Sequence, residues 1–290
     1  MISPWVSSVL LWSTERWWFI PAVESIVDAL VELTGGNRVL LAALMSSIAA
    51  ASTTLGALPA LVVKYKRDEP RSLEKLINAG LGFSSGVMLV TSFTGLLLPS
   101  VEGGGLLIAL TGLLLGALLV AVVNELVPHE HFLKGFEGPA WLRSKAKASW
   151  LVAFAIILHN IPEGFSIGVA SAYQVLDGFK VGLAISLQDV PEGLAVALPV
   201  LAITGSKKMA LLVAFLSGLS ELLVAVPTAT VFTEASEVLY LGLSFASGAM
   251  IYVVSHEALP ESHRAGREKL ATVGFFLGFI LMLCLDVALG

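Results

Sequence analysis

The sequence predicts an all-α polytopic membrane protein, and three observations lead to this prediction. Hydrophobic residues make up 56% of the 290 residues and charged residues only 13%, whereas soluble domains carry about 25% charge. The mean hydropathy is strongly positive, at +0.87. Apolar stretches of roughly twenty residues, the length that crosses a bilayer as a helix, recur along the chain.

We expect eight transmembrane helices with short connections, so that consecutive helices run antiparallel. A loop at 173–179 is expected between the fourth and fifth of them. The expected spans are 39–63, 76–98, 106–127, 149–172, 180–202, 209–232, 238–259 and 270–289.

The basic residues predict the orientation of this eight-helix core. Segments 64–75, 128–148, 203–208 and 260–269 hold 14 of the 17 lysines and arginines. All four segments fall on one side, which the positive-inside bias identifies as the cytoplasm. We therefore expect a multi-pass protein of the cell membrane with the N- and C-termini outside.

Residues 1–35 are expected to form a separate N-terminal segment ahead of a transmembrane domain at 36–290. Glu24, Asp28 and Glu32 recur every four residues, which favours an amphipathic helix at the outer membrane surface. A ninth membrane crossing is the alternative. The tryptophans that suit an interfacial belt are Trp5, Trp12, Trp17 and Trp18.

Two similar hexapeptides, His159-Asn-Ile-Pro-Glu-Gly164 and Gln188-Asp-Val-Pro-Glu-Gly193, lie 29 residues apart within consecutive expected spans. Glu163 follows His159 by four residues and Asn160 by three, so the three side chains share one helix face. The same relation holds in the second copy. An ionisable group at membrane depth needs a partner or a function, and the antiparallel helices place the two motifs opposite each other.

The proline and glycine of each motif favour a close, polar helix contact. Pro162 and Pro191 lack an N–H group, so the carbonyl four residues earlier loses its helical partner. Gly164 and Gly193 have no side chain and permit a neighbouring helix to approach.

A third expected span contributes Glu221, which brings the number of mid-membrane carboxylates to four. Four adjacent anions in a low-dielectric region are unfavourable, and two divalent cations would neutralise them. Nitrogen and oxygen ligands without thiolates suit Zn²⁺, and also Cd²⁺, Mn²⁺ or Fe²⁺. The alternative is that these groups only hydrogen-bond to one another between helices. The expected ligands are His159, Asn160, Glu163, Gln188, Asp189, Glu192 and Glu221.

The paired motifs, followed by Ser217-Gly-Leu-Ser-Glu221, resemble those of the ZIP (Zrt/Irt-like) divalent-metal transporters over about residues 39–290. The resemblance implies a 3+2+3 arrangement of helices with inverted repeats and a binuclear metal site. It implies that one metal is held by His159, Glu163, Gln188 and Glu192, with Met88 as an added ligand. It implies that the other is held by Asn160, Asp189 and Glu221, with Glu163 and Glu192 bridging.

The resemblance also implies functional residues at both ends of the pathway. The alternative for each is an ordinary solvated side chain at a helix end or in a loop. At the entrance the residues are Glu102 and Asp286, and at the exit they are His256, Glu257, His129 and His131.

Together these features predict transport of divalent cations toward the cytoplasm, and no enzymatic activity. The resemblance implies an elevator-like motion of the site against spans two, three, seven and eight, and a possible homodimer. The expected partners are two metal ions per site and the lipid bilayer, with no organic cofactor and no nucleic acid. A cation or proton channel and an intramembrane metalloenzyme are the alternatives, although the HExxH motif of helical zinc proteases is absent.

Overall fold

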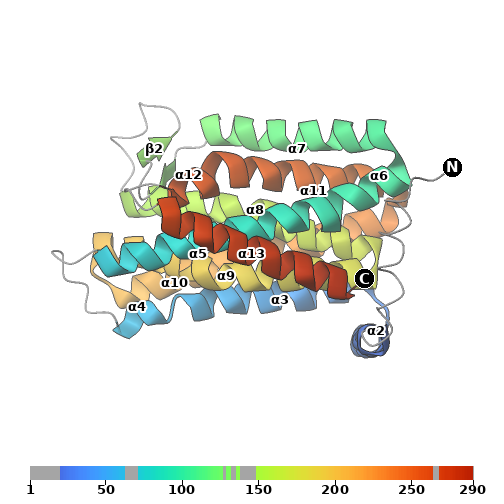
Figure 1. Cartoon of the computed structure of the whole chain (residues 1–290), viewed down its shortest axis with the longest axis horizontal. Coiled ribbons are helices and arrows are strands. Elements are labelled where there is room, and N and C mark those ends of the chain that lie inside the picture. Colours follow the sequence, from blue (N-terminus) through green and yellow to red (C-terminus); the bar gives the residue numbers. More distant parts are fainter. Residues whose placement is uncertain are drawn as a thin grey trace.

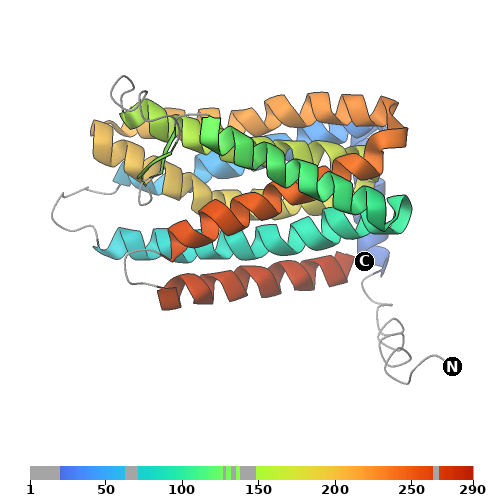
Figure 2. The same ribbon diagram turned by 90° about the horizontal axis from the view of Figure 1, so that it is seen from above.

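The computed structural model describes residues 20–62, 71–126, 129–131, 135–137, 148–263 and 268–289. Its long helices lie side by side along the longest axis of the molecule (Figures 1 and 2). Helices make up nearly all of the described residues, and the strands among them form only one short antiparallel pair. The prediction of an all-α membrane protein is therefore confirmed.

The helices before the strand pair are α2 (Ile20–Thr34), α3 (Arg38–Gly56), α4 (Pro59–Val62), α5 (Arg71–Val90), the π-helical η3 (Thr91–Leu97), α6 (Leu98–Gly104) and α7 (Leu106–Leu126). The strands are β1 (His129–His131) and β2 (Gly135–Glu137). After them come α8 (Ala148–Tyr173), α9 (Val175–Thr204), α10 (Lys207–Glu234), the short η5 (Ser236–Val238), α11 (Leu239–Val253), the π-helical η6 (Val254–Ala258), α12 (Leu259–Ser262) and α13 (Glu268–Leu289).

Seven helical segments among the described residues are long and apolar enough to cross a membrane, and they match seven of the expected spans. The fourth expected span coincides with α8, whose side chains at 148–157 lie outside the described residues. The number eight therefore stays a prediction. Two boundaries were wrong: the loop expected at 173–179 is the single residue Gln174, and the second span continues past residue 98 to Gly104.

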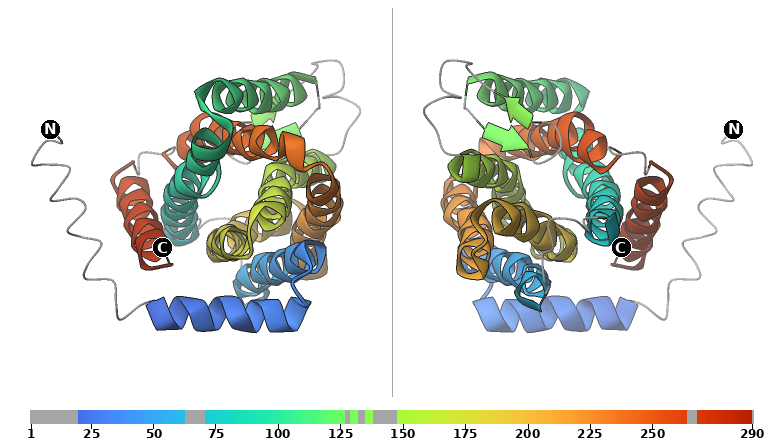
Figure 3. Two further views of the ribbon diagram at one scale, coloured as in Figure 1. Left: turned by 90° about the vertical axis from the view of Figure 1, so that its right-hand side faces the viewer. Right: turned by 90° about the vertical axis from the view of Figure 1, so that its left-hand side faces the viewer.

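Helix α2 lies across one end of the bundle instead of along it (Figure 3). Gly35 and Gly36 adopt φ values of 60° and 74° and turn the chain into α3. The side chain of Asn37 then caps α3 by accepting hydrogen bonds from the N–H groups of Val39 and Leu40. The crosswise position suits the interfacial helix that we predict, but the four tryptophans of that prediction lie outside the described residues.

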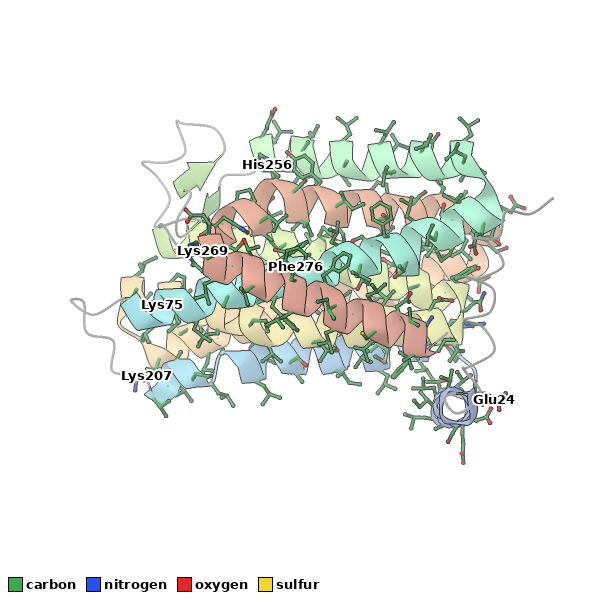
Figure 4. All side chains as sticks on the ribbon, in the orientation of Figure 1. Glu24, Lys75, Lys207, His256, Lys269 and Phe276 are labelled. Carbon is green, nitrogen blue, oxygen red and sulfur yellow. The ribbon has the colours of Figure 1, made fainter. Side chains whose placement is uncertain are left out.

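The two ends of the bundle differ in charge. We call them the α2 end, where the C-terminal residue of α13 also lies, and the strand end, where β1 and β2 lie. Figure 4 shows Lys75, Lys207 and Lys269 at the strand end and Glu24 on α2 at the other. The strand end is thus the side that the positive-inside bias assigns to the cytoplasm.

Two π-helical segments interrupt the second and the seventh of the eight expected spans in the same way. Segment η3 is followed by Leu98-Pro99, and η6 is followed by Leu259-Pro260. A proline cannot donate a helical hydrogen bond, and a local π-turn accommodates the missing donor. The segments run in opposite directions and their Leu-Pro pairs lie toward opposite ends of the bundle, as an inverted repeat requires.

The helices pack as two groups. Helices α3, α8, α9 and α10 contact one another closely, and we call them the motif group. The remaining helices from α5 to α7 and from α11 to α13, with η3 and η6, are called the support group. Within it, α5 contacts α13 and α7 contacts α11. Backbones touch within the groups: a Cβ atom at Gly86 would lie 2.1 Å from the carbonyl oxygen of Phe275. Across the seam between the groups, Gly80 and Gly95 face side-chain atoms of Pro191 and Val181. The seam therefore joins side chains, which rearrange more easily than two backbones in contact.

Candidate metal centre

The two motif helices lie side by side in the middle of the bundle, surrounded by the other helices (Figure 3). Helix α8 continues without a break through Pro162, and α9 continues through Pro191. Because only Gln174 separates them, they run antiparallel and their motifs meet at one depth.

Three carboxylates converge at this point. Glu163, Asp189 and Glu192 each offer a carboxylate oxygen, and the three oxygens lie within 4.8 Å of one another. Glu163 and Asp189 are fully buried, and Glu192 is partly exposed. Oxygens at this separation can share one or two divalent cations as ligands.

Glu221 of α10 completes the set of four carboxylates. Asn160 Nδ2 donates to Glu221 Oε1 over 2.6 Å and to the carbonyl of Ser217 over 3.2 Å. Thr53 of α3 also donates to Glu221 Oε1, over 3.5 Å. With its NH₂ group so engaged, Asn160 has its Oδ1 atom left to serve a cation.

The motif glycines create this meeting of helices, as the sequence predicted. A Cβ atom at Gly164 would lie 2.5 Å from the carbonyl oxygen of Glu221, and one at Gly193 would lie 1.9 Å from that of Thr53. These glycines let α8 approach α10 and let α9 approach α3. Both contacts lie at residues that form the site.

Several oxygens of the cluster are buried without a hydrogen-bond partner. Gln188 Nε2 donates to Glu163 Oε1 over 2.5 Å, and Oε2 of Glu163 and Oε1 of Gln188 are left without a hydrogen bond. A buried acceptor without a donor is costly unless it meets an ion. The donor set therefore fits a hard or borderline divalent cation. Asp189 and Glu221 lie within side-chain hydrogen-bonding range of each other, but as ionised carboxylates neither supplies a donor. The oxygens that meet no donor are Glu163 Oε2, Gln188 Oε1, Asp189 Oδ1, Asp189 Oδ2 and Glu221 Oε2.

His159 lies at the edge of the cluster that is nearer the strand end. Its Nε2 atom is 2.8 Å from Oε2 of Glu257 in η6, and it also lies within electrostatic range of Glu192. Asn124 of α7 donates to the other oxygen of Glu257. Glu257 is thus buried beside the site and does not lie in a solvated loop.

Exposure within the cluster is one-sided. The side chain of His159 is 26% exposed and Glu192 is partly exposed, whereas Glu163, Asp189 and Glu221 are buried. Because α8 and α9 are antiparallel, His159 and Glu192 are both the members nearer the strand end. The described arrangement is therefore more open toward the strand end than toward the α2 end.

The other predicted site residues lie at different depths. Met88 is buried in the apolar core, one turn along α5 from Ser84, which donates to the carbonyl of Gln188 over 3.0 Å. Glu102 is exposed on α6 at the α2 end, so it lies on a helix and not after one. Asp286 pairs with Lys180 across 3.6 Å.

The predicted exit residues gather toward the strand end. His256 is exposed, with its ring centroid 5.1 Å from that of Tyr252. His129 and His131 lie on β1, which packs against α8, and their side chains lie outside the described residues.

Sequence reasoning missed four residues that contact the site or its neighbours, namely Thr53, Ser84, Asn124 and Lys180. Asn124 and Lys180 carried a signal, since each is a strongly polar side chain at the edge of an apolar stretch. Thr53 and Ser84 carried none, because hydroxyl groups are common in transmembrane helices.

The fold and the site together define a polytopic membrane protein with a cluster of carboxylates, a candidate cation-binding centre, buried between its helices. A sequence model described as the ZIP zinc transporter family matches residues 137–286. Together with the relatives described below, this match shows that the chain belongs to the ZIP zinc transporter family, whose members are transporters and not enzymes.

Curated relatives extend the similarity over most of the chain. Zinc transporter ZIPB of Bordetella bronchiseptica is 41% identical over 280 residues, covering 92% of this chain and 87% of that protein. Zinc transporter GufA of Myxococcus xanthus is 39% identical over 255 residues, covering 84% and 97% respectively. Zinc transporter ZupT of Clostridium perfringens is 28% identical over 280 residues, covering 85% and 95%.

Proposed function

We propose that this protein carries divalent cations, Zn²⁺ foremost, through the membrane toward the cytoplasm by way of a binuclear site. The observation that carries the proposal is the group of five unbonded, buried oxygens on Glu163, Gln188, Asp189 and Glu221. Relatives named as zinc transporters support zinc as the cargo. Cd²⁺, Mn²⁺ and Fe²⁺ suit the same donor set.

The charge of the site supports two cations bound per site. Glu163, Asp189, Glu192 and Glu221 carry four negative charges when ionised, and two divalent cations balance them. In this proposal Glu163 and Glu192 bridge the metals, His159 and Gln188 complete the first, and Asn160, Asp189 and Glu221 hold the second. Met88 is the proposed soft ligand of the first metal.

Two observations support the orientation of the protein in the membrane and the state of the pathway in this proposal. Lysines gather at the strand end, which favours a cytoplasmic position for that end. His159 and Glu192, the more exposed ligands, face the same end. We infer an inward-facing arrangement, entered past Glu102 and Asp286 and left past Glu257, His256 and the histidines of β1.

The packing of the helices supports an elevator-like motion. The motif group contains every proposed ligand except Met88, and its helices touch through their backbones. The seam to the support group is made of side chains. A motif group that slides as one body would expose the site to each side in turn, and would keep every proposed ligand except Met88 together.

The proposal is tested by uptake of Zn²⁺ and Cd²⁺ into proteoliposomes over a range of metal concentrations. Wild type is compared with Glu192→Ala and with Glu237→Gln, which changes an exposed acid at the α2 end and serves as the control. Saturable uptake that only Glu192→Ala abolishes supports the proposal. Uptake that rises without saturation would favour a channel, and the absence of wild-type uptake would contradict transport of these metals.

A further inference from the structure

Lys180 is a buried cation that has no role in the proposed transport pathway. Its side chain is 8% exposed within α9, and its Nζ atom lies 3.6 Å from Oδ1 of Asp286 in α13. Lysine is almost never buried without a counter-ion. A fixed positive charge near a cation pathway also repels the cargo, so a role in binding metal does not explain Lys180.

The pair belongs to a balanced cluster of charges at the α2 end. The carboxylate of Asp177 lies within electrostatic range of Lys180, Asp286 and Arg38. Two positive and two negative groups cancel, so the cluster as a whole does not attract cations. Asp286, predicted from the family resemblance to guide cations inward, is instead occupied by Lys180 in this arrangement.

The position of the pair between the two helix groups suggests what it does. Lys180 belongs to the motif group and Asp286 to the support group. Helix α13 packs along α5 and touches α9 at few points. The ion pair is therefore one of few direct contacts between α9 and α13 among the described residues, beside the apolar packing of Ala184 and Met282.

Other polar contacts between the groups lie deeper in the bundle. Ser84 donates to the carbonyl of Gln188 beside the metal centre, and His159 meets Glu257 on the strand-end side. The Lys180–Asp286 pair is on the opposite side of the metal centre from the His159–Glu257 pair. It thus joins the groups where the described arrangement is closed.

We propose that the Lys180–Asp286 ion pair is a latch that holds the α2 end closed and opens when the motif group moves. This inference rests on the proposed alternating transport, with the α2 end outside. Movement of α9 along α13 separates the two charges, and water entering the seam then solvates both. A partly buried ion pair holds best where water is excluded, so the latch favours the inward-facing arrangement.

The first test measures opening directly and needs no transport. Ala184, one turn after Lys180, is buried beside Val87, Val90 and Met282 in the seam. A cysteine introduced there by Ala184→Cys, with the native cysteine removed by Cys284→Ser, reports access from outside to a membrane-impermeant maleimide. We expect Lys180→Met and Asp286→Asn each to speed labelling about fivefold or more. Lys269→Met, at an exposed lysine at the strand end, is the control and should leave labelling unchanged.

The charge-swapped protein, Lys180→Asp with Asp286→Lys, keeps both charges and restores the latch, so labelling should return toward the wild-type rate. This rescue separates a latch from simple damage to the fold. Unchanged labelling in both single variants would overturn the proposal. Opposite changes in the two would also overturn it, since they would show that only the net charge of the cluster matters.

The second test is uptake of Cd²⁺ into proteoliposomes by the same variants. A latch predicts that both single substitutions change the maximal rate in the same direction, and that the swap corrects it. Opposite shifts in KM alone, with the maximal rate constant, would overturn the latch in favour of electrostatic attraction. If wild type takes up no metal at all, the proposed function fails, and labelling at position 184 still decides whether the latch exists.

Discussion

His159 Nε2 lies 2.8 Å from Glu257 Oε2, and this contact joins the motif group to the support group beside the metal centre. His159 is the sole imidazole among the predicted ligands, so it has two competing partners: a carboxylate of η6 and a metal held by α8 and α9. Asn124 fixes the other oxygen of Glu257. A metal bound to Nε2 of His159 would displace Glu257, whereas a metal bound to Nδ1 would leave this contact in place. We propose the first arrangement, in which Glu257 and the metal compete for Nε2.

Replacing the carboxylate of Glu257 tests that competition. Glu257→Gln keeps the size of the side chain but turns a hydrogen bond to a charged carboxylate into one to a neutral amide, which is weaker by about 1 kcal/mol. His159 is then freer to bind metal, and we expect Zn²⁺ to bind about fivefold more tightly in calorimetric titrations. Glu268→Gln, at the exposed start of α13, is the control. Weaker binding would show that Glu257 is not a competitor, and that it either orients His159 for a metal at Nδ1 or is itself a ligand.

The two-metal arrangement predicts unequal effects for two glutamates. Glu192 is proposed to bridge both metals, so Glu192→Ala should abolish uptake. Glu221 is proposed to serve the metal near Asn160 and Asp189, so Glu221→Ala should leave part of the uptake. Metal content by mass spectrometry should fall from two ions to about one in Glu221→Ala. Equal, mild losses in both variants would contradict a binuclear site.

The close approach of α9 to α3 predicts that Gly193 tolerates no side chain. In Gly193→Ala the new Cβ atom would lie 1.9 Å from the carbonyl oxygen of Thr53, and overpacking of this kind costs about 1–3 kcal/mol. We expect the midpoint of thermal unfolding in detergent to fall by several degrees. Gly95→Ala is the matched control, because its Cβ would lie 3.0 Å from a side-chain methyl group of Val181, a much milder approach than 1.9 Å to a backbone oxygen. A similar fall in both variants would argue against a special contact at Gly193.

The sequence was sufficient for seven of the eight predicted membrane-crossing segments and for the meeting of the two motifs, because hydropathy and a repeated hexapeptide are local signals. It predicted the helix ends less well. Nothing in the pattern showed that the second span continues through a π-helix to Gly104, or that Gln174 alone joins α8 and α9. Both depend on how the backbone packs at the end of the bundle.

The partners of the site were beyond prediction for a different reason. Thr53 and Glu221 are 168 residues apart, and Asn124 and Glu257 are 133 residues apart. Spacing along one helix says which side chains share a face, but not which face of another helix they meet. The family resemblance placed Glu257 at the exit, but nothing in the sequence indicated that its side chain is buried against His159.

The unbonded oxygens of the site predict that metal stabilises the folded protein. A ligand that binds only the native state contributes about 2.7 kcal/mol at a concentration 100 times its Kd. Zn²⁺ should therefore raise the midpoint of thermal unfolding of wild type by several degrees, and a chelator should reverse the effect. Asp189→Asn removes one negative charge from the cluster at a residue whose two oxygens are unbonded, so the shift caused by Zn²⁺ should shrink markedly. Glu237→Gln, an exposed acid at the α2 end, should keep the full shift. If Zn²⁺ stabilises wild type and Asp189→Asn equally, the metal binds elsewhere and the buried oxygens do not form its site.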